Sequence, residues 1–189
     1  MRALYLIRHS LTEANEKHLY GGSTDIPLIQ KGREIAIQRR GCLPECDTYL
    51  SSGMQRADET LWLMTGRRPD VVLGGLREMD FGAFEMRSYE EMKDDPDYLA
   101  WIGDRTGEVR CPGGESTNLF HARVLAEGAK LLRMEVDSAC VVCHGGAIVY
   151  LMQAWFTSVD RHFYEWQPQA CRGYRIAVED GAPVGFEEV

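Results

Sequence analysis

Near its start the chain reads Leu4-Tyr5-Leu6-Ile7-Arg8-His9-Ser10-Leu11-Thr12-Glu13-Ala14-Asn15, an apolar run that opens into a polar loop. Strand-forming side chains fill the run, and a guanidinium and an imidazole follow it directly, at Arg8 and His9. Ligands of open α/β proteins bind beyond the carboxyl ends of the strands. We therefore predict a buried strand that delivers both side chains to a binding site. The simpler interpretation is a strand end with two solvated polar residues, and the later segments decide between the two.

Strand and helix patterns alternate along the rest of the chain. Short strands are predicted at 48–51, 71–73 and 138–143, helices at 31–40, 54–64, 117–135 and from the glycines after His144 through Trp155, and a terminal hairpin around 174–178 with a turn at Asp180-Gly181. Residues 10–30 are expected to form a functional loop, and 88–103 a helix that is interrupted at Pro96. This alternation is typical of an α/β fold, here a three-layer α/β/α sandwich with a mostly parallel central sheet.

Size and charge narrow the class of protein. A chain of 189 residues predicts a single domain that spans 1–189. The formal net charge of −8 argues against binding to nucleic acid or to an anionic membrane surface, although a local arginine cluster can still hold a small anion. No secretory leader and no run of roughly 20 apolar residues is recognisable in the sequence. We therefore expect a cytoplasmic protein whose six cysteines are reduced thiols.

Further polar groups stand where other strands end. His144 and Gly145 follow the fourth predicted strand, and Arg56 lies in the first turn of the helix that follows the second. Neighbouring parallel strands end on the same side of a sheet, so these groups are expected to meet Arg8 and His9. Two arginines and two histidines around one point would bind a dianionic phosphate through charge-assisted hydrogen bonds.

Neutral donors and a carboxylate complete the predicted site. Asn15 and the backbone amides of the Gly21-Gly22 turn can add hydrogen bonds to an anion, and Glu78 stands in the loop after the third strand. The aromatic residues within 81–101 either line a substrate pocket or pack a helix onto the sheet. Packing is the more common fate of such side chains.

The cysteines permit two other interpretations. Cys140-Val141-Val142-Cys143-His144 matches the pattern for covalent haem attachment, and Cys42 and Cys46 could join Cys140 and Cys143 around zinc. Residues three apart in a strand face opposite sides of the sheet, which separates Cys140 from Cys143. We therefore favour thiols that pack in the core.

The same residues make the chain resemble the histidine phosphatase superfamily, which has the phosphoglycerate mutase-like fold, over nearly its whole length. In order along the chain, the matching motifs are Leu6-Ile7-Arg8-His9-Ser10 with Thr12 and Asn15; Gly22, Asp25, Pro27, Leu28 and Gly32; Ser51-Ser52 with Arg56-Ala57 and Thr60; Leu76-Arg77-Glu78 with Phe81-Gly82; Pro112-Gly113-Gly114-Glu115-Ser116; and His144-Gly145-Gly146. Each motif is weak alone, but the ordered set is highly specific.

Some positions depart from the family's usual pattern. Ser10 stands where Gly or Ala is usual, Gly21 where Gln is common, Gly53 where Pro is frequent and Met86 where Gly is frequent. None of these changes removes a catalytic group, although Gly21 weakens one expected contact to phosphate or substrate. The chain is short for a cofactor-dependent phosphoglycerate mutase, which favours a phosphatase. The runs at 20–28 and 77–82 look most like those of the α-ribazole phosphatases of cobalamin assembly.

The resemblance implies a phosphomonoesterase that hydrolyses a small-molecule phosphate ester, such as α-ribazole phosphate or a phosphosugar. His9 would attack phosphorus and form a phosphohistidine, and Glu78 would act first as general acid and then as general base. The other implied catalytic groups are Arg8, Arg56 and a protonated His144, and the implied substrate-binding residues are Asn15, Gly21, Gly22 and Gly145. Such an enzyme is a metal-independent histidine acid phosphatase-type hydrolase, with no cofactor.

Two other functions stay open. A phosphoglycerate mutase-type enzyme would return the phosphate from the phosphohistidine to an isomer of the substrate, and its activity would depend on added bisphosphoglycerate. A non-catalytic phosphate-binding module would keep the pocket without turnover. The sequence also leaves open whether the chain acts as a monomer or as a homodimer.

Overall fold

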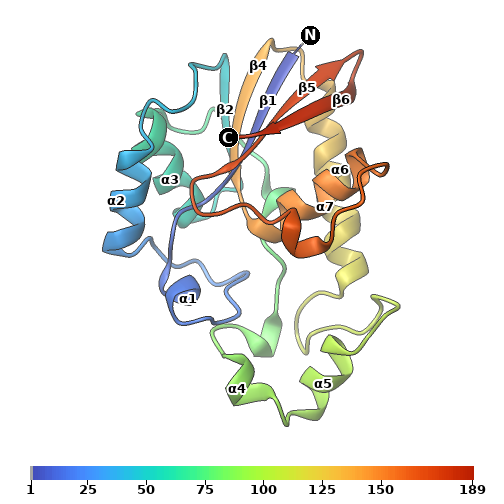
Figure 1. Ribbon diagram of the computed structural model, residues 1–189. Coiled ribbons are helices and arrows are strands. Elements are labelled where there is room, and N and C mark those ends of the chain that lie inside the picture. The colour runs from blue at the N-terminus through green and yellow to red at the C-terminus, as the bar shows by residue number, and fades with distance from the viewer. Residues whose placement is uncertain (1) are drawn as a thin grey trace.

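A six-stranded sheet organises the part of the chain that the computed structural model describes, residues 2–189 (Figure 1). The strands are β1 (Arg2–Arg8), β2 (Thr48–Ser51), β3 (Val71–Val72), β4 (Ser138–Cys143), β5 (Gly173–Glu179) and β6 (Ala182–Glu188). The helices are α1 (Glu13–Glu16), α2 (Gln30–Gln38), α3 (Gln55–Thr65), α4 (Tyr89–Met92), α5 (Pro96–Ile102), α6 (Thr117–Arg133) and α7 (Gly145–Trp155). Short 3-10 turns add η1 (Gly74–Leu76), η2 (Gly82–Phe84) and η3 (Phe163–Glu165). Every predicted strand is present, and the tail forms the predicted hairpin.

The strand order, β3-β2-β4-β1-β5-β6, combines a parallel part with an antiparallel edge. Strands β3, β2, β4 and β1 run parallel, and β5 and β6 add the antiparallel hairpin beside β1. Arg8 pairs with Cys143 across β1 and β4, and Ser51 pairs with Val142 across β2 and β4. These three strands therefore end at nearly the same level, so the residues that follow them meet at one edge of the sheet.

Helices cover both faces of this sheet (Figure 1). Alternate residues of a strand point to opposite faces. Leu4 and Leu6 of β1 belong to a core with residues of α6 and α7, whereas Tyr5 and Ile7 belong to a second core with residues of α2 and α3. The result is the predicted three-layer α/β/α sandwich with a mostly parallel sheet.

The cysteines of β4 follow the same alternation. Cys143 lies in the core beneath α6 and α7, while Cys140 lies in the opposite core together with Cys46. Burial raises the pKa of the Cys140 and Cys143 thiols, so both stay protonated. Cys42 is exposed on the surface. The sheet thus separates the thiols that the haem and zinc interpretations need side by side, and core packing is the interpretation that fits.

The segment predicted as one long functional loop contains a short helix. Thr12 caps α1: its hydroxyl accepts the N–H of Asn15, and the Asn15 side chain accepts the N–H of Thr12 at 3.0 Å. This reciprocal cap usually has Glu or Gln at its third helical position. Because Asn15 occupies that position here, the sequence pattern did not indicate the helix. The capped turn fixes Asn15 close to the carboxyl end of β1.

The interrupted helix predicted at 88–103 is two helices. Ser88 caps α4, and Asp95 caps α5 with Pro96 in its first turn, where the missing proline N–H costs no hydrogen bond. Helices α1, α4 and α5 lie beyond the carboxyl ends of the parallel strands (Figure 1). They build a separate layer over the edge of the sheet where the site residues gather. Within residues 2–189, no helix is both long and apolar enough to cross a membrane.

Candidate active site

His9 stands at the carboxyl end of β1 and is almost fully buried, with 5% of its surface exposed. Its Nδ1 lies 2.6 Å from the carbonyl oxygen of Ser10, so Nδ1 carries the proton and donates. The Nε2 atom is left with its lone pair. Burial, and then the charges of Arg56 and Arg8, lower the pKa of His9 well below its usual range. His9 is therefore a neutral imidazole in the tautomer that a nucleophile at Nε2 requires.

His144 faces His9 from the end of β4, with the two ring centroids 5.0 Å apart. Arg56 donates its Nε–H to Nδ1 of His144 at 3.3 Å, and Nε2 lies 2.8 Å from the Ser52 hydroxyl. A nitrogen that accepts from a guanidinium cannot carry a proton, so Nε2 holds the only ring proton. Burial, and then the neighbouring basic groups, lower the pKa of His144 well below its usual range. Burial and these contacts therefore favour a neutral ring at position 144 over the expected imidazolium.

Arg56 enters the site from the first turn of α3 and is fully buried. Its two terminal nitrogens donate to the carbonyl oxygens of Gly22 at 2.7 Å and of Thr24 at 2.9 Å. The Gly22 N–H is directed away and donates to the Glu85 carboxylate at 3.1 Å. Gly22 therefore holds Arg56 in place, in contrast to our expectation that it contacts the substrate.

A glycine is required at position 22 for close approach. A Cβ atom there would lie 1.8 Å from the carbonyl oxygen of Met79 and 2.6 Å from the Glu85 carboxylate. The loop after β1 and the loop after β3 thus touch through this backbone. Substitution of Gly22 would separate the segment that holds Arg56 from the segment that carries Glu78.

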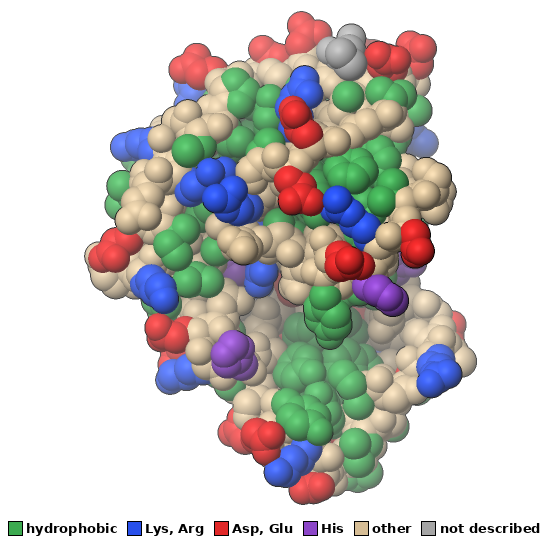
Figure 2. Space-filling model, in the orientation of Figure 1, with side chains coloured by type: hydrophobic (Ala, Val, Ile, Leu, Met, Phe, Trp, Pro, Cys, Tyr) green, Lys and Arg blue, Asp and Glu red, His purple; other side chains and the backbone are tan. Residues whose placement is uncertain are grey.

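A cavity of about 570 Å³ opens beside these buried groups, and Arg8, Asn15, Gly21 and Glu78 line it. On the face drawn in Figure 2 the molecule is hollowed between the body that holds the sheet and the part that carries α4 and α5. Hydrophobic side chains gather around the lower side of this hollow (Figure 2). The volume is in the range of pockets that bind small molecules.

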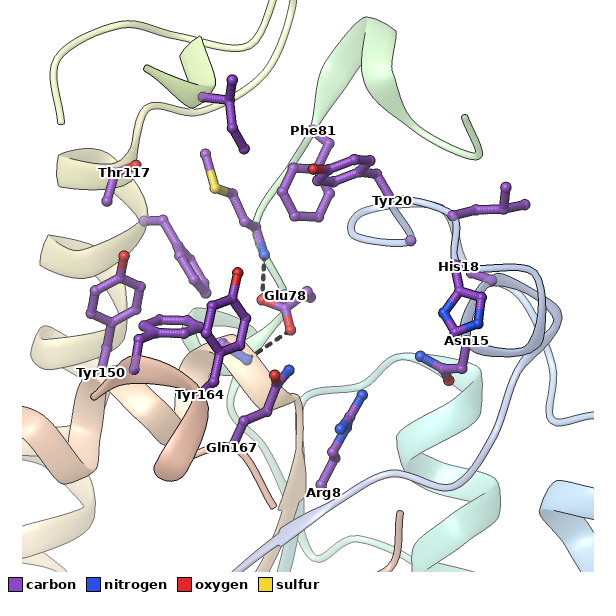
Figure 3. A pocket seen from close by; sticks show the side chains of 18 of the residues that line it. Arg8, Asn15, His18, Tyr20, Glu78, Phe81, Thr117, Tyr150, Tyr164 and Gln167 are labelled. Carbon is purple, nitrogen blue, oxygen red and sulfur yellow. Dashed lines mark hydrogen bonds between the residues drawn. The ribbon is translucent and has the colours of Figure 1, made fainter. Parts of the chain in front are cut away.

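Arg8 and Asn15 point into the cavity from opposite ends of the loop after β1 (Figure 3). Arg8 donates to the carbonyl oxygen of Pro168 at 2.9 Å, which holds its guanidinium upright in the cavity. The Asn15 oxygen accepts from both the N–H and the hydroxyl of Thr12, each at 3.0 Å, so its amide nitrogen is turned toward Arg8. Both predicted contacts to an anion are available here.

Two glycines shape the ends of the cavity. Gly21 lines it, and a Cβ at this position would lie 2.5 Å from Cβ of Ala14. Gly145, the first residue of α7, lies beside Arg8: a Cβ there would come within 2.7 Å of the Gln167 amide nitrogen and 3.4 Å of Nε of Arg8. Gly145 therefore leaves room for the Arg8 guanidinium next to the N-terminus of a helix, where anions are favoured.

Glu78 points into the centre of the cavity, across from Arg8 (Figure 3). Its Oε1 accepts the N–H of Met79 and its Oε2 accepts the N–H of Gly146, both at 3.0 Å. Gly146 belongs to the first turn of α7, whose dipole favours a negative group there. The carboxylate is thus held in one orientation, with one side open to the cavity.

Arg123 of α6 holds the Glu78 loop, and no motif in the sequence indicated it. Its guanidinium donates to the carbonyl oxygens of Gly75 and Arg77 at 3.0 Å and of Glu78 at 3.2 Å, and it pairs with Glu115 at 2.7 Å. An arginine in a long amphipathic helix ordinarily faces solvent, so its pattern gave no signal. Here it donates hydrogen bonds to three backbone carbonyl oxygens and so fixes the loop that presents Glu78.

The connection between α7 and β5 supplies further lining residues that the sequence did not indicate. Gln167 lies between Arg8 and Tyr164, and Tyr150 of α7 lies beyond Tyr164, on the side away from Arg8 (Figure 3). The aromatic residues within 81–101 include both of the predicted kinds, residues that pack in the core and residues that line a pocket. Phe84 and Tyr98 are buried in the core, whereas Phe81 and Trp101 line the cavity. Whether an aromatic residue of this segment is buried or lines the cavity depends on its contacts with residues distant in the sequence, so the local pattern does not reveal it.

One end of the cavity can therefore bind a tetrahedral oxyanion. Arg8 and Asn15 line this end, and next to Arg8 lies His9, whose ring is 5.0 Å from that of His144, which Arg56 contacts. The side chains at positions 8, 9, 56 and 144 meet as predicted, with Arg56 and His144 in direct contact. Within residues 2–189, no group of three or more His, Cys, Asp or Glu side chains is arranged to hold a metal ion.

Lowering the pH from about 7.5 to about 5.5 is expected to destabilise the folded protein. The unfolded chain takes up a proton at each histidine as the pH falls below about 6.5. Burial lowers the pKa of His9 and His144, so the folded state takes up fewer protons in that window. The free energy of unfolding should therefore fall with pH, by up to about 1.4 kcal/mol per pH unit for each histidine. Urea denaturation at several pH values measures this slope.

The variant His144→Gln is the matched control for that measurement. It removes one of the two buried imidazoles and should flatten the dependence of unfolding free energy on pH. A free energy of unfolding that stays constant from about pH 7.5 to about 5.5 would contradict the neutral state of the two rings.

A known protein family matches nearly the whole chain. Residues 4–185 match the model of the histidine phosphatase superfamily (branch 1). The chain therefore belongs to the histidine phosphatase superfamily, and its fold is that of the phosphoglycerate mutase-like members. The coverage, almost the whole chain, includes every residue of the oxyanion end of the cavity.

Individual relatives carry more specific names. The adenosylcobalamin/α-ribazole phosphatase of Salmonella typhimurium is 33% identical over 164 residues, which is 82% of this chain and 79% of that protein. The crystal structure of the α-ribazole phosphatase from Shigella flexneri superposes with a TM-score of 0.86 at 26% identity, covering 96% of this chain and 93% of that one. A phosphoglycerate mutase structure from Thermus thermophilus reaches a TM-score of 0.75 at 28% identity and covers 97% of each chain.

Proposed function

We propose that this protein is a phosphomonoesterase that works through a phosphohistidine on His9. The observation that carries the proposal is the tautomer of His9. Its Nδ1 donates to the Ser10 carbonyl at 2.6 Å, so the lone pair of Nε2 is free beside two arginines. A neutral imidazole held next to fixed positive charge suits attack on a phosphate dianion.

In the first step Nε2 of His9 forms a bond to phosphorus, and the bond from phosphorus to the ester oxygen breaks. Glu78 gives its proton to the departing alkoxide, which leaves as the alcohol. Arg8, Arg56, His144 and Asn15 hold the oxygens of the phosphoryl group during transfer. Glu78 faces Arg8 across the cavity, so the leaving group lies on the Glu78 side.

In the second step Glu78 takes a proton from a water molecule, and the water oxygen bonds to phosphorus as the bond to Nε2 breaks. Inorganic phosphate leaves, and His9 returns to the neutral state. General acid and base catalysis of this kind contributes typically about 10²–10⁴-fold. The arginines and imidazoles supply the charge and hydrogen bonds that the transferred group needs, so the proposal requires neither a metal ion nor a cofactor.

The natural substrate that we propose is a small phosphate ester such as α-ribazole phosphate. The support is the name of the Salmonella and Shigella relatives, together with the mostly uncharged lining of the cavity. A phosphosugar is the second candidate of the same reaction class. A phosphoglycerate would add a carboxylate, for which the cavity offers few cations beyond those that bind the phosphate.

Phosphate release by the full chain, measured in the presence of EDTA, tests the proposed function. The esters to compare are α-ribazole 5′-phosphate, ribose 5-phosphate, 3-phosphoglycerate and p-nitrophenyl phosphate. We expect release from α-ribazole 5′-phosphate to be the most efficient and to persist in EDTA. Isomerisation of 3-phosphoglycerate that depends on added bisphosphoglycerate would favour a mutase, and no release from any ester would favour a binding module.

A further inference from the structure

Two walls of aromatic side chains stand on opposite sides of the cavity beside Glu78. One wall is built from Tyr20, Phe81 and Trp101, and the other from Phe120, Tyr150, Phe163 and Tyr164. Figure 3 shows Tyr20 and Phe81 on one side of Glu78 and Tyr150 and Tyr164 on the other. Any leaving group that Glu78 protonates must lie between these walls.

The first wall is rigid. The rings of Tyr20 and Phe81 are 5.1 Å apart, and both stand edge-on to Trp101 at 5.7 and 5.8 Å. The Tyr20 hydroxyl forms a 2.7 Å hydrogen bond with the hydroxyl of Tyr98, which is buried behind it. A ring that enters the cavity therefore meets a surface already fixed in shape, and ordering it costs little conformational entropy.

The second wall ends at Tyr164, whose ring is mostly exposed to solvent. Phe163 packs on Tyr150 at 5.7 Å and on Tyr164 at 5.5 Å. The Tyr164 side chain itself is 82% exposed, although it lines the cavity. The Glu165 carboxylate accepts the N–H of His162 at 2.6 Å and so holds the turn that carries Tyr164. A large aromatic surface is thus held at the mouth of the cavity, and most of it is open to solvent.

Charge is scarce along these walls. The lining residues with ionisable side chains, tyrosines apart, are Arg8, His18 and Glu78. Arg8 lies at the oxyanion end, and Glu78 has the proposed role of general acid and base. A carboxylate or a second phosphate on the leaving group would find few partners here, whereas aromatic rings pack well against one another in edge-to-face and offset arrangements.

We propose that the space between the walls is a subsite for a flat aromatic ring on the alcohol of the phosphate ester, and that Tyr164 covers this ring. This inference rests on the proposed function, because the phosphate must bind at His9 for its alcohol to lie beside Glu78. The subsite makes the protein selective for phosphate esters of alcohols that carry such a ring, over esters of the same alcohol without it.

The first test compares two esters that differ in the ring. We expect kcat/KM for α-ribazole 5′-phosphate to exceed that for ribose 5-phosphate by at least about tenfold, as one well-packed aromatic contact allows. The ratio of the two values should fall in Tyr164→Ala, which leaves the other rings of both walls in place, and should be kept in Tyr164→Phe, which retains the ring. Equal values for the two esters in the unmodified protein would overturn the subsite.

The variant Tyr89→Ala is the matched control. Tyr89 is also an exposed tyrosine, at 57%, but it does not line the cavity. Its removal should leave the ratio for the two esters unchanged. A ratio that falls in Tyr89→Ala as far as in Tyr164→Ala would show that loss of any surface tyrosine has the effect, and would remove the proposed role of Tyr164.

A binding measurement separates failure of the subsite from failure of the proposed function. The probe is α-ribazole without its phosphate, titrated by calorimetry against D-ribose as the control. Binding of the riboside that weakens at least about fivefold in Tyr164→Ala would support the subsite even in a protein that hydrolyses no ester. Turnover of both esters without binding of the riboside would keep the phosphatase and overturn the ring subsite.

Discussion

Replacement of His9 by alanine is expected to reduce phosphate release from any ester by at least about 10⁴-fold, as loss of a catalytic nucleophile does. The variant removes Nε2, the proposed nucleophile, and the second imidazole at the oxyanion end is not expected to replace it. Nδ1 of His144 accepts a hydrogen bond from Arg56 and Nε2 carries the ring proton beside Ser52, so neither nitrogen has a free lone pair for attack. The measurement is steady-state turnover together with acid-labile labelling of the protein by a ³²P-labelled ester.

The control for this prediction is His18→Asn. His18 is an exposed imidazole on the rim of the cavity with a φ of 53°, a left-handed conformation that asparagine tolerates. The variant should still form the acid-labile label, because it keeps His9. Labelling that survives in His9→Ala would place the covalent intermediate on another residue and refute the mechanism.

Replacement of Glu78 by glutamine is expected to slow alkyl phosphates by about 10²–10⁴-fold, the usual range for a general acid. The amide has nearly the same shape as the carboxylic acid but has no proton to give to an alkoxide. An alkoxide leaving group needs that proton, whereas p-nitrophenolate is stable without it. Turnover of p-nitrophenyl phosphate should therefore fall much less than turnover of ribose 5-phosphate.

The comparison of the two esters carries its own control, because both use the same oxyanion end. If Glu78→Gln slowed them equally, the residue would act on the geometry of the loop and not as an acid. The loop is fixed from behind by Arg123, which contacts the backbone oxygen of Glu78 at 3.2 Å and does not depend on the side chain that is changed. A selective loss for the alkyl ester thus reports proton transfer.

The sequence predicted the oxyanion end of the site because that end depends on strand termini. Arg8 ends β1, His9 follows it and His144 follows β4, and parallel pairing alone brings them to one edge. Arg56 follows from the same argument, in the first turn of α3. A local pattern and one rule of topology were therefore sufficient for these four residues.

The rest of the site depends on contacts that no local pattern contains. Arg123 lies 45 residues from Glu78, whose carbonyl it holds, and Gln167 and Tyr164 lie in a connection without regular motif. The lowered pKa of His144 was likewise not predictable, because burial of the ring and the hydrogen bond from Arg56 are properties of the folded site. Gly22 was assigned to the substrate, yet its backbone serves Arg56.

The connection between α7 and β5 supplies both the carbonyl oxygen of Pro168 that supports Arg8 and the largely uncovered ring of Tyr164. Those two positions lie close together in one short segment, whereas His9 and His144 directly follow strands of the central sheet. Exchange of this short segment would therefore alter the mouth of the cavity and the support of Arg8 together, so the two cannot diverge independently unless position 168 keeps its backbone conformation.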